Sequence, residues 1–302
     1  MDRAYLIIQK VSYAYITYVT RFIHAELKRN FNDGAELIIC DEIDEATHEK
    51  NAIIFVIGEG FAPHQRRPGC TYVYLNFSII AVMGNPLKLS RIGWSAIRRK
   101  QRMLREKQDC YDILLDYFPP QTKRLQRRMK MPVFGFQVAI DPETLPPAVP
   151  LAERPYDVCF VGGPSARRKT VLDALEQAGI RLSPQTGVVY EEIAAQSRCC
   201  LNIHAYRSNH LETPRIVGAL ATGTPLVTEP SYGLKTVFPN GSVTTAPFAR
   251  LAEAAASLGR MPEEKSNGPT DANWYRDTYL PQSRALWADL CTNIRQIAAD
   301  AP

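Results

Sequence analysis

The chain has 302 residues, of which 45% are hydrophobic and 22% charged, and its 36 basic and 31 acidic side chains leave a formal charge of +5. This is the composition of a globular protein, and it excludes a disordered, collagen-like or disulfide-stapled chain. Length alone predicts about two domains of roughly 150 residues each. The mild positive charge permits an anionic partner without requiring one.

Several features predict a cytoplasmic protein. Apolar runs such as 5–8 and 53–57 are far too short to span a bilayer, and residues 1–3 lack the pattern of a cleavable signal. The seven cysteines are an odd number, and Cys199 and Cys200 are adjacent in an apolar run, which favours reduced, packed thiols. Because these two cysteines lack the spacing of zinc ligands, we predict no metal site, and no cofactor is expected.

Short apolar runs alternate with amphipathic segments along the first half of the chain. Such alternation is typical of an α/β domain with a parallel sheet. Strands are expected at 4–9, 36–41, 52–57, 72–77, 111–117 and 133–138, and helices at 13–31, 87–107 and 121–130. The runs 36–41 and 52–57 are continuously apolar, which predicts strands that are buried on both faces.

A segment with five prolines, 141–155, has no helical or alternating period. Because proline fixes its own backbone and extends the residue before it, this segment is predicted to be a semi-rigid linker between domains at 1–140 and 156–302. The second domain repeats the α/β pattern. Its strands are expected at 156–161, 199–204, 225–228 and 243–245, and its helices at 166–178, 190–197, 212–221, 249–258, 273–279 and 282–297.

The loop after the first strand of the second half is the richest candidate site. It contains Gly162 and Gly163, and it is followed by Arg167, Arg168 and Lys169 at the start of a helix. Glycines let backbone N–H groups approach an anion, and the helix start adds a positive dipole end. Cations at a helix start are unfavourable without an anion. A diphosphate site is therefore favoured over a plain solvated turn.

A second group of polar residues lies between the strand at 199–204 and the helix that starts near Pro214. In open α/β sheets, ligands bind where loops leave the carboxyl ends of the strands, so this loop is a second candidate. The polar residues are Asn202, His204, Tyr206, His210, Glu212, Thr213 and Arg215.

These segments, in this order, carry a family resemblance. Residues 157–163 with Arg167 and Arg168, then 201–204, 212–215 and 221–228, resemble the C-terminal half of GT-B glycosyltransferases, most of all the CgeB-like (glycosyl transferase family 1-like) group. The resemblance implies two Rossmann-like domains that face each other across a cleft. It also implies a nucleotide-sugar donor on the C-terminal domain, an acceptor on the N-terminal domain, and no catalytic metal.

The resemblance assigns roles to individual residues. Gly162, Gly163 and Arg167 or Arg168 would approach the donor diphosphate. The second group of polar residues would face the sugar and diphosphate. These residues lie from the end of the strand at 199–204 to the start of the next helix, and they are Asn202, His204, Tyr206, His210, Glu212, Thr213 and Arg215. His204 and Arg215 are candidate catalytic residues, although a histidine that ends a buried strand is also a common structural residue.

One position departs from the family. A glutamate often stands three residues after the arginine, where it holds the ribose hydroxyls, but this chain has Gly218. Glu212 is an alternative ribose contact. A non-catalytic nucleotide-binding or scaffold protein that keeps the GT-B fold is therefore the alternative to a glycosyltransferase.

An inverting transferase also needs a base for the acceptor hydroxyl. Glu59 and His64 follow the strand at 52–57 and are the candidates, with a plain turn carboxylate and a surface histidine as the alternatives. The acceptor is a glycan, a lipid-linked molecule or a protein.

The helix at 87–107 carries eight cations against the single acid Glu106, with Trp94 beside them. A solvated face and peripheral contact with the inner membrane surface are both compatible with this pattern. Nucleic acid ranks behind them, because no aromatic platform or known binding motif accompanies the charge.

Overall fold

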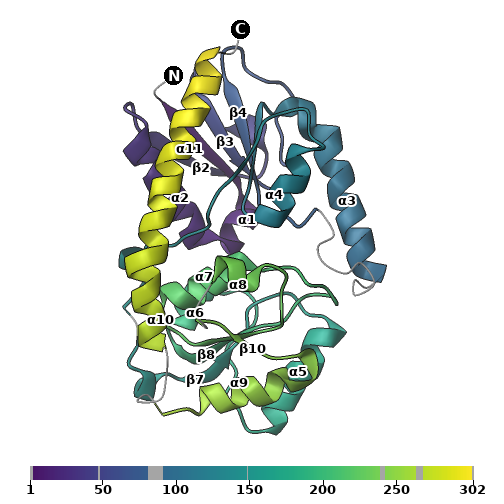
Figure 1. Cartoon of the computed structure of the whole chain (residues 1–302), viewed down its shortest axis with the longest axis vertical. Coiled ribbons are helices and arrows are strands. Elements are labelled where there is room, and N and C mark those ends of the chain that lie inside the picture. Colours follow the sequence, from purple (N-terminus) through teal and green to yellow (C-terminus); the bar gives the residue numbers. More distant parts are fainter. Residues whose placement is uncertain are drawn as a thin grey trace. The chain divides into compact units, whose positions relative to one another are not determined.

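The computed structural model describes residues 3–46, 48–80, 91–147, 149–238, 242–262 and 268–300 (Figure 1). The chain divides into two compact units. The first holds the described residues of 1–83, 94–139 and 282–302, and the second those of 84–93 and 140–281. Each unit is built on a parallel sheet, of six strands in the first and four in the second. The predicted α/β class is confirmed.

The sheet of the first unit has the order β2-β1-β3-β4-β5-β6. Its strands are β1 (Ala4–Gln9), β2 (Ala35–Cys40), β3 (Ile53–Ile57), β4 (Thr71–Asn76), β5 (Ile113–Asp116) and β6 (Val133–Gly135). β3 is buried along its whole length, as predicted. The prediction of burial on both faces is wrong for residues 36–41, because β2 is an edge strand whose Glu36 and Ile39 are exposed.

The first unit also contains helices. They are α1 (Lys10–Tyr15), α2 (Thr17–Asn30), α3 (Arg91–Lys107), α4 (Pro119–Gln126) and α11 (Leu280–Asp300), with short 3-10 turns at Ile43–Glu45 and Gln108–Cys110. The single helix expected at 13–31 is interrupted at Ile16, whose φ of −135° is not helical. The helix expected at 121–130 starts earlier, because Pro119 and Pro120 fit its first turn. Residues 87–90 of the expected basic helix lie outside the described residues.

The C-terminal helix belongs to the first unit, so its predicted place in a 156–302 domain is wrong. Trp287 on α11 is fully buried, lies edge-on to Phe136 at 5.6 Å between ring centroids, and donates a hydrogen bond to the Gln137 carbonyl at 3.2 Å. Its buried neighbours one and two turns along, Leu290, Cys291 and Ile294, continue the same face. This apolar stripe holds the helix on a sheet far away in sequence.

The proline-rich segment is docked on the second unit. It contains 3-10 turns at Pro142–Thr144 and Leu151–Glu153. Arg154 is buried, and its Nη1 donates to the Ser197 carbonyl at 2.7 Å and to Thr224 Oγ1 at 3.0 Å. These contacts anchor the C-terminal end of segment 141–155, which the sequence predicts to be a semi-rigid linker.

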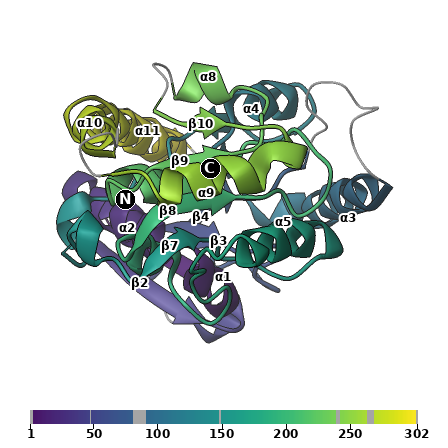
Figure 2. The ribbon, with the colours of Figure 1, turned by 90° about the horizontal axis from the view of Figure 1, so that it is seen from below.

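The sheet of the second unit has the order β10-β9-β8-β7. Its strands are β7 (Tyr156–Cys159), β8 (Ser197–Asn202), β9 (Leu226–Thr228) and β10 (Thr244–Thr245). Its helical segments are α5 (Ala166–Gln177), α6 (Tyr190–Ala194), α7 (Thr213–Ala221), α8 (Leu234–Val237), the 3-10 turn Phe248–Arg250, α9 (Leu251–Gly259), α10 (Gly268–Trp274) and the π-helical turn Tyr275–Tyr279. Helices α5 and α9 cover one face of this sheet, and α6 and α7 cover the other (Figures 1 and 2).

Candidate functional site

The two polar loops of the second unit meet at the carboxyl ends of β7 and β8. Gly162 follows β7, and Arg215 lies in the first turn of α7. A Cβ atom on Gly162 would lie 2.8 Å from Arg215 Nη2 and 3.3 Å from Arg168 Nη1, so both arginine side chains approach the backbone of this glycine closely. The structure thus brings together three of the predicted donor-site residues from separate loops.

Arg168 and Arg215 lie over one aromatic ring. Their guanidinium carbons are 5.1 Å and 5.4 Å from the ring centroid of Phe160. Arg168 is buried, and it donates to the Ile203 carbonyl at 3.1 Å and to the Gly163 carbonyl at 2.8 Å. Burial, followed by the neighbouring charge of Arg215, lowers the pKa of Arg168. Two like charges held this close favour an anion that neutralises both.

Arg215 is held by its own helix start and by β8. Its Nε lies 3.3 Å from Glu212 Oε2, and its Nη1 donates to Asn202 Oδ1 at 3.4 Å. Asn202 is fully buried and donates in turn to Thr228 Oγ1 at 3.0 Å, so it orients the arginine. Thr213, the first residue of α7, is buried, and its Oγ1 has no hydrogen-bond partner in the described part of the chain.

Arg167 and Lys169 point to protein carboxylates. Arg167 forms a two-pronged ion pair with Glu229, donates to the His204 carbonyl at 3.1 Å, and stacks on Phe248 at 3.9 Å. Lys169 is exposed and pairs with Asp173 at 2.6 Å. Of the three consecutive cations that the sequence singles out, Arg168 contacts the glycine turn, whereas Arg167 and Lys169 pair with Glu229 and Asp173.

His204 has the contacts of a structural histidine. It is 1% exposed, its Nδ1 lies 3.1 Å from the Ser208 carbonyl, and its Nε2 lies 3.2 Å from Ser231 Oγ. Its backbone N–H donates to Glu229 Oε1 at 2.9 Å. With both ring nitrogens engaged, the ring orders the loop after β8. His210 is also buried, and its ring lies edge-on to that of Tyr206 at 6.2 Å.

Glu229 is a site residue that the sequence reasoning missed. It follows β9 directly, as Gly162 and the 203–212 loop follow β7 and β8, so its place at the sheet edge was the available signal. Its carboxylate ties Arg167 to the backbone of His204.

Gly218 is required by helix packing. A Cβ atom there would lie 2.8 Å from Tyr190 Cε1 and 3.3 Å from Glu191 Oε1, both on α6. A larger side chain at position 218 would therefore overlap α6. Glu191 is itself buried, and burial raises its pKa to about 7.

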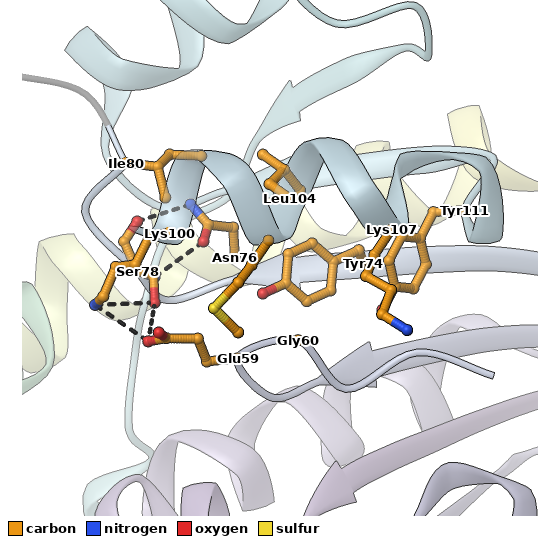
Figure 3. A pocket seen from close by; sticks show the side chains of 11 residues that line it. Glu59, Gly60, Tyr74, Asn76, Ser78, Ile80, Lys100, Leu104, Lys107 and Tyr111 are labelled. Carbon is orange, nitrogen blue, oxygen red and sulfur yellow. Dashed lines mark hydrogen bonds and ion pairs between the residues drawn. The ribbon is translucent and has the colours of Figure 1, made fainter. Parts of the chain in front are cut away.

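In the first unit, Glu59 lies in the loop after β3 (Figure 3). Its carboxylate accepts a hydrogen bond from Ser78 Oγ at 3.3 Å and pairs with Lys100 at 3.3 Å and Arg99 at 3.4 Å. Glu59, Ser78 and Lys100 border a cavity of about 20 Å³, which is room for one water-sized group such as a hydroxyl. His64 lies apart from this cavity, is largely exposed, and pairs with Asp44.

Other kinds of site find no support in the described residues. No group of three or more His, Cys, Asp or Glu there is placed to hold a metal ion. None of the seven cysteines, all of which lie in the described residues, forms a disulfide, and burial raises the pKa of the Cys199 thiol, which makes it unreactive. Among the described helices, none combines the length and apolar character needed to cross a bilayer.

Solved structures with this architecture identify the fold. HepE from Anabaena, solved with UDP and glucose, superposes over the full length of both chains with a TM-score of 0.59 at 10% identity. AviGT4, a glycosyltransferase involved in avilamycin A biosynthesis, matches 100% of this chain and 99% of its own, with a TM-score of 0.54 at 13% identity. The chain has the GT-B fold.

A longer GT-B enzyme matches as well. TarM from S. aureus, solved with UDP and α-GlcNAc-glycerol, matches 82% of this chain with a TM-score of 0.55 at 10% identity. This chain spans 57% of the TarM chain. No protein-family model matches the sequence, and no curated protein is significantly similar to it in sequence.

Proposed function

We propose that the chain is a glycosyltransferase that moves a sugar from a nucleotide-diphosphate sugar to an acceptor hydroxyl. The observation that carries this proposal is the pair Arg168 and Arg215, stacked on Phe160 beside Gly162 at the carboxyl edge of the second sheet. The GT-B fold, shared over its full length with HepE in complex with UDP and glucose, supports a nucleotide-sugar donor.

Sugar transfer passes through an oxocarbenium-like state while the nucleotide diphosphate leaves with its charge. Preorganised cations and N–H groups are the usual means of stabilising such charge. Here Arg168, Arg215, the backbone of Gly162 and Gly163 and the start of the twelve-residue helix α5 supply them. We propose that these groups do so without a divalent metal. Glu212 and Thr213, beside Arg215, complete the proposed donor contacts.

Glu59 is the proposed base for the acceptor. Its carboxylate borders a cavity large enough for a hydroxyl, at the end of a sheet strand where ligands bind in α/β folds. Proton transfer from that hydroxyl to Glu59 would generate the attacking oxygen. The acceptor would be a glycan, a lipid-linked molecule or a protein.

Three finer assignments belong to this proposal. The chain would fall in the CgeB-like (family 1-like) group of GT-B enzymes. It would act in the cytoplasm, at the inner membrane surface, with the basic segment 87–107, whose described part is α3, as the contact. The alternative to a transferase is a scaffold that binds a nucleotide without turnover. Gly218 favours this alternative, because α6 fills the space that a ribose-binding carboxylate at this position would need.

Nucleotide binding tests the donor site. Calorimetry against UDP, GDP, TDP and CMP should find one that binds, and Arg215→Met should weaken that nucleotide at least about tenfold, since charge-assisted contacts to phosphate are strong. The matched control is Lys169→Met. This variant removes an exposed cation of α5 that pairs with Asp173, and it should leave nucleotide affinity unchanged.

The outcomes separate the two functions. Nucleotide binding with hydrolysis or transfer of the matching sugar nucleotide supports the transferase. Binding without any turnover favours the scaffold. If none of the nucleotides binds, or if Arg215→Met binds as tightly as Lys169→Met, the donor site is wrong.

A further inference from the structure

A groove on the first unit has the composition of a site for an anionic lipid. It lies between α3 and α4 and has a volume of about 320 Å³, within the size range of small-molecule sites. Ten residues line it: Ile80, Gln101, Leu104, Arg105, Gln108, Arg124, Leu125, Arg128, Met129 and Lys130.

The lining divides into an apolar floor and a cationic rim. Ile80, Leu104 and Leu125 are buried, and Met129 packs beside them against the core of the first unit. Arg105, Arg124, Arg128 and Lys130 are exposed, and none of the ten described lining residues carries a carboxylate. The groove therefore offers hydrocarbon contact at its base and four positive charges at its mouth.

The polar lining is fixed in place. Gln101 on α3 donates from Nε2 to the Ile80 carbonyl at 2.7 Å, and Arg105 Nε donates to the Gln101 carbonyl at 3.2 Å. On the opposite wall, the backbone N–H groups of Arg128 and Met129 both donate to the Leu125 carbonyl at 2.9 Å. Both walls thus present their cations from ordered backbone.

We propose that this groove binds one anionic phospholipid, with the phosphate on the arginines and lysine and the first part of a hydrocarbon chain on the floor. Free phosphate would leave the apolar side chains Ile80, Leu104, Leu125 and Met129 unused, and the described lining residues include no aromatic ring on which nucleic-acid bases would stack. Trp94, an exposed ring on α3 beneath the Arg98 guanidinium at 5.8 Å, is a residue type that gathers at membrane interfaces. The proposal concerns the first unit alone and does not depend on donor binding.

Binding of a monomeric lipid to the whole chain tests this site. Short-chain lysophosphatidic acid, kept below its micelle concentration, should bind by calorimetry, whereas glycerol 3-phosphate, its chainless equivalent, should bind at least about tenfold more weakly because the chain contributes by its apolar area. The zwitterionic lysophosphatidylcholine of equal chain length should also bind more weakly.

Two double variants separate the groove from general surface charge. Arg124→Gln with Arg128→Gln removes two rim charges and should weaken the lipid at least about tenfold, since each cation near an anionic lipid contributes about a factor of five. Lys123→Gln with Arg127→Gln removes two exposed charges from the same segment outside the groove, and should change the affinity less than about twofold.

The floor has its own variant. Met129→Gln should weaken the lipid but leave glycerol 3-phosphate unaffected. Equal losses in the two double variants, equal affinity for glycerol 3-phosphate, tighter binding of a nucleic acid than of lipid, or no binding of the monomeric lipid would each overturn the proposal. Loss of lipid binding leaves the Arg215 result unchanged, so the two proposals fail independently.

Discussion

Glu59 carries a prediction at the scale of a single residue. Glu59→Gln keeps the size of the side chain but removes the base and the negative charge beside Lys100 and Arg99, so the turnover number should fall at least about 100-fold, the lower range for loss of a general base. Nucleotide affinity should stay the same, because the proposed donor residues belong to the second unit. Steady-state kinetics and nucleotide calorimetry measure the two effects.

The matched control is His64→Gln, in the same loop. That side chain is exposed and lies outside the Glu59 cavity, so its turnover should remain that of the natural chain. A Glu59→Gln variant with nearly full turnover would remove this residue from the mechanism.

The packing of α6 against α7 gives a prediction at the scale of elements. Gly218→Ala places a methyl group 2.8 Å from the Tyr190 ring, and overpacking of this kind costs about 1–3 kcal/mol. Urea denaturation should show this loss of unfolding free energy. Gly163→Ala, where nothing lies within 4 Å of the added Cβ, should change stability little.

A double variant attributes the cost to one contact. In a Tyr190→Leu background the added methyl has room, so Gly218→Ala should lower the unfolding free energy less than it does alone. The difference between the two losses is the coupling energy between positions 190 and 218. The same cost in both backgrounds would show that the helices do not exclude a side chain at this position.

At the scale of the whole molecule, the last helix stabilises a sheet formed by the first half of the chain. Trp287→Ala removes a fully buried ring packed on Phe136 and should cost about 3–5 kcal/mol. Leu286→Ala, one residue earlier and 38% exposed, should cost less than about 1 kcal/mol.

Hydrogen exchange locates the effect. Peptides that cover β5 and β6 should lose protection in Trp287→Ala, while those that cover β8 and β9 should keep it. Protection lost first in the second unit would contradict the placement of α11.

The strands and the glycine turn were predictable because their signals are local. A run such as 4–9 is apolar up to its last residue, Gln9, and the observed β1 has the same bounds. The choice among Arg167, Arg168 and Lys169 was not local. Consecutive side chains on a helix point about 100° apart, so which one meets the turn depends on what the fold places around them. Glu229, which binds Arg167, lies 62 residues away.

The amino-acid order by itself determined the alternation of strands and helices, the α/β class and the polar loops at strand ends, because each follows from the periodicity and chemistry of neighbouring residues. The tertiary structure decided that Arg168 and Arg215 share the Phe160 ring, that α6 fills the space beside Gly218, and that residues 282–300 join the first unit. Those outcomes depend on which distant surfaces pack together, and packing of distant surfaces leaves no mark in the pattern of adjacent residues.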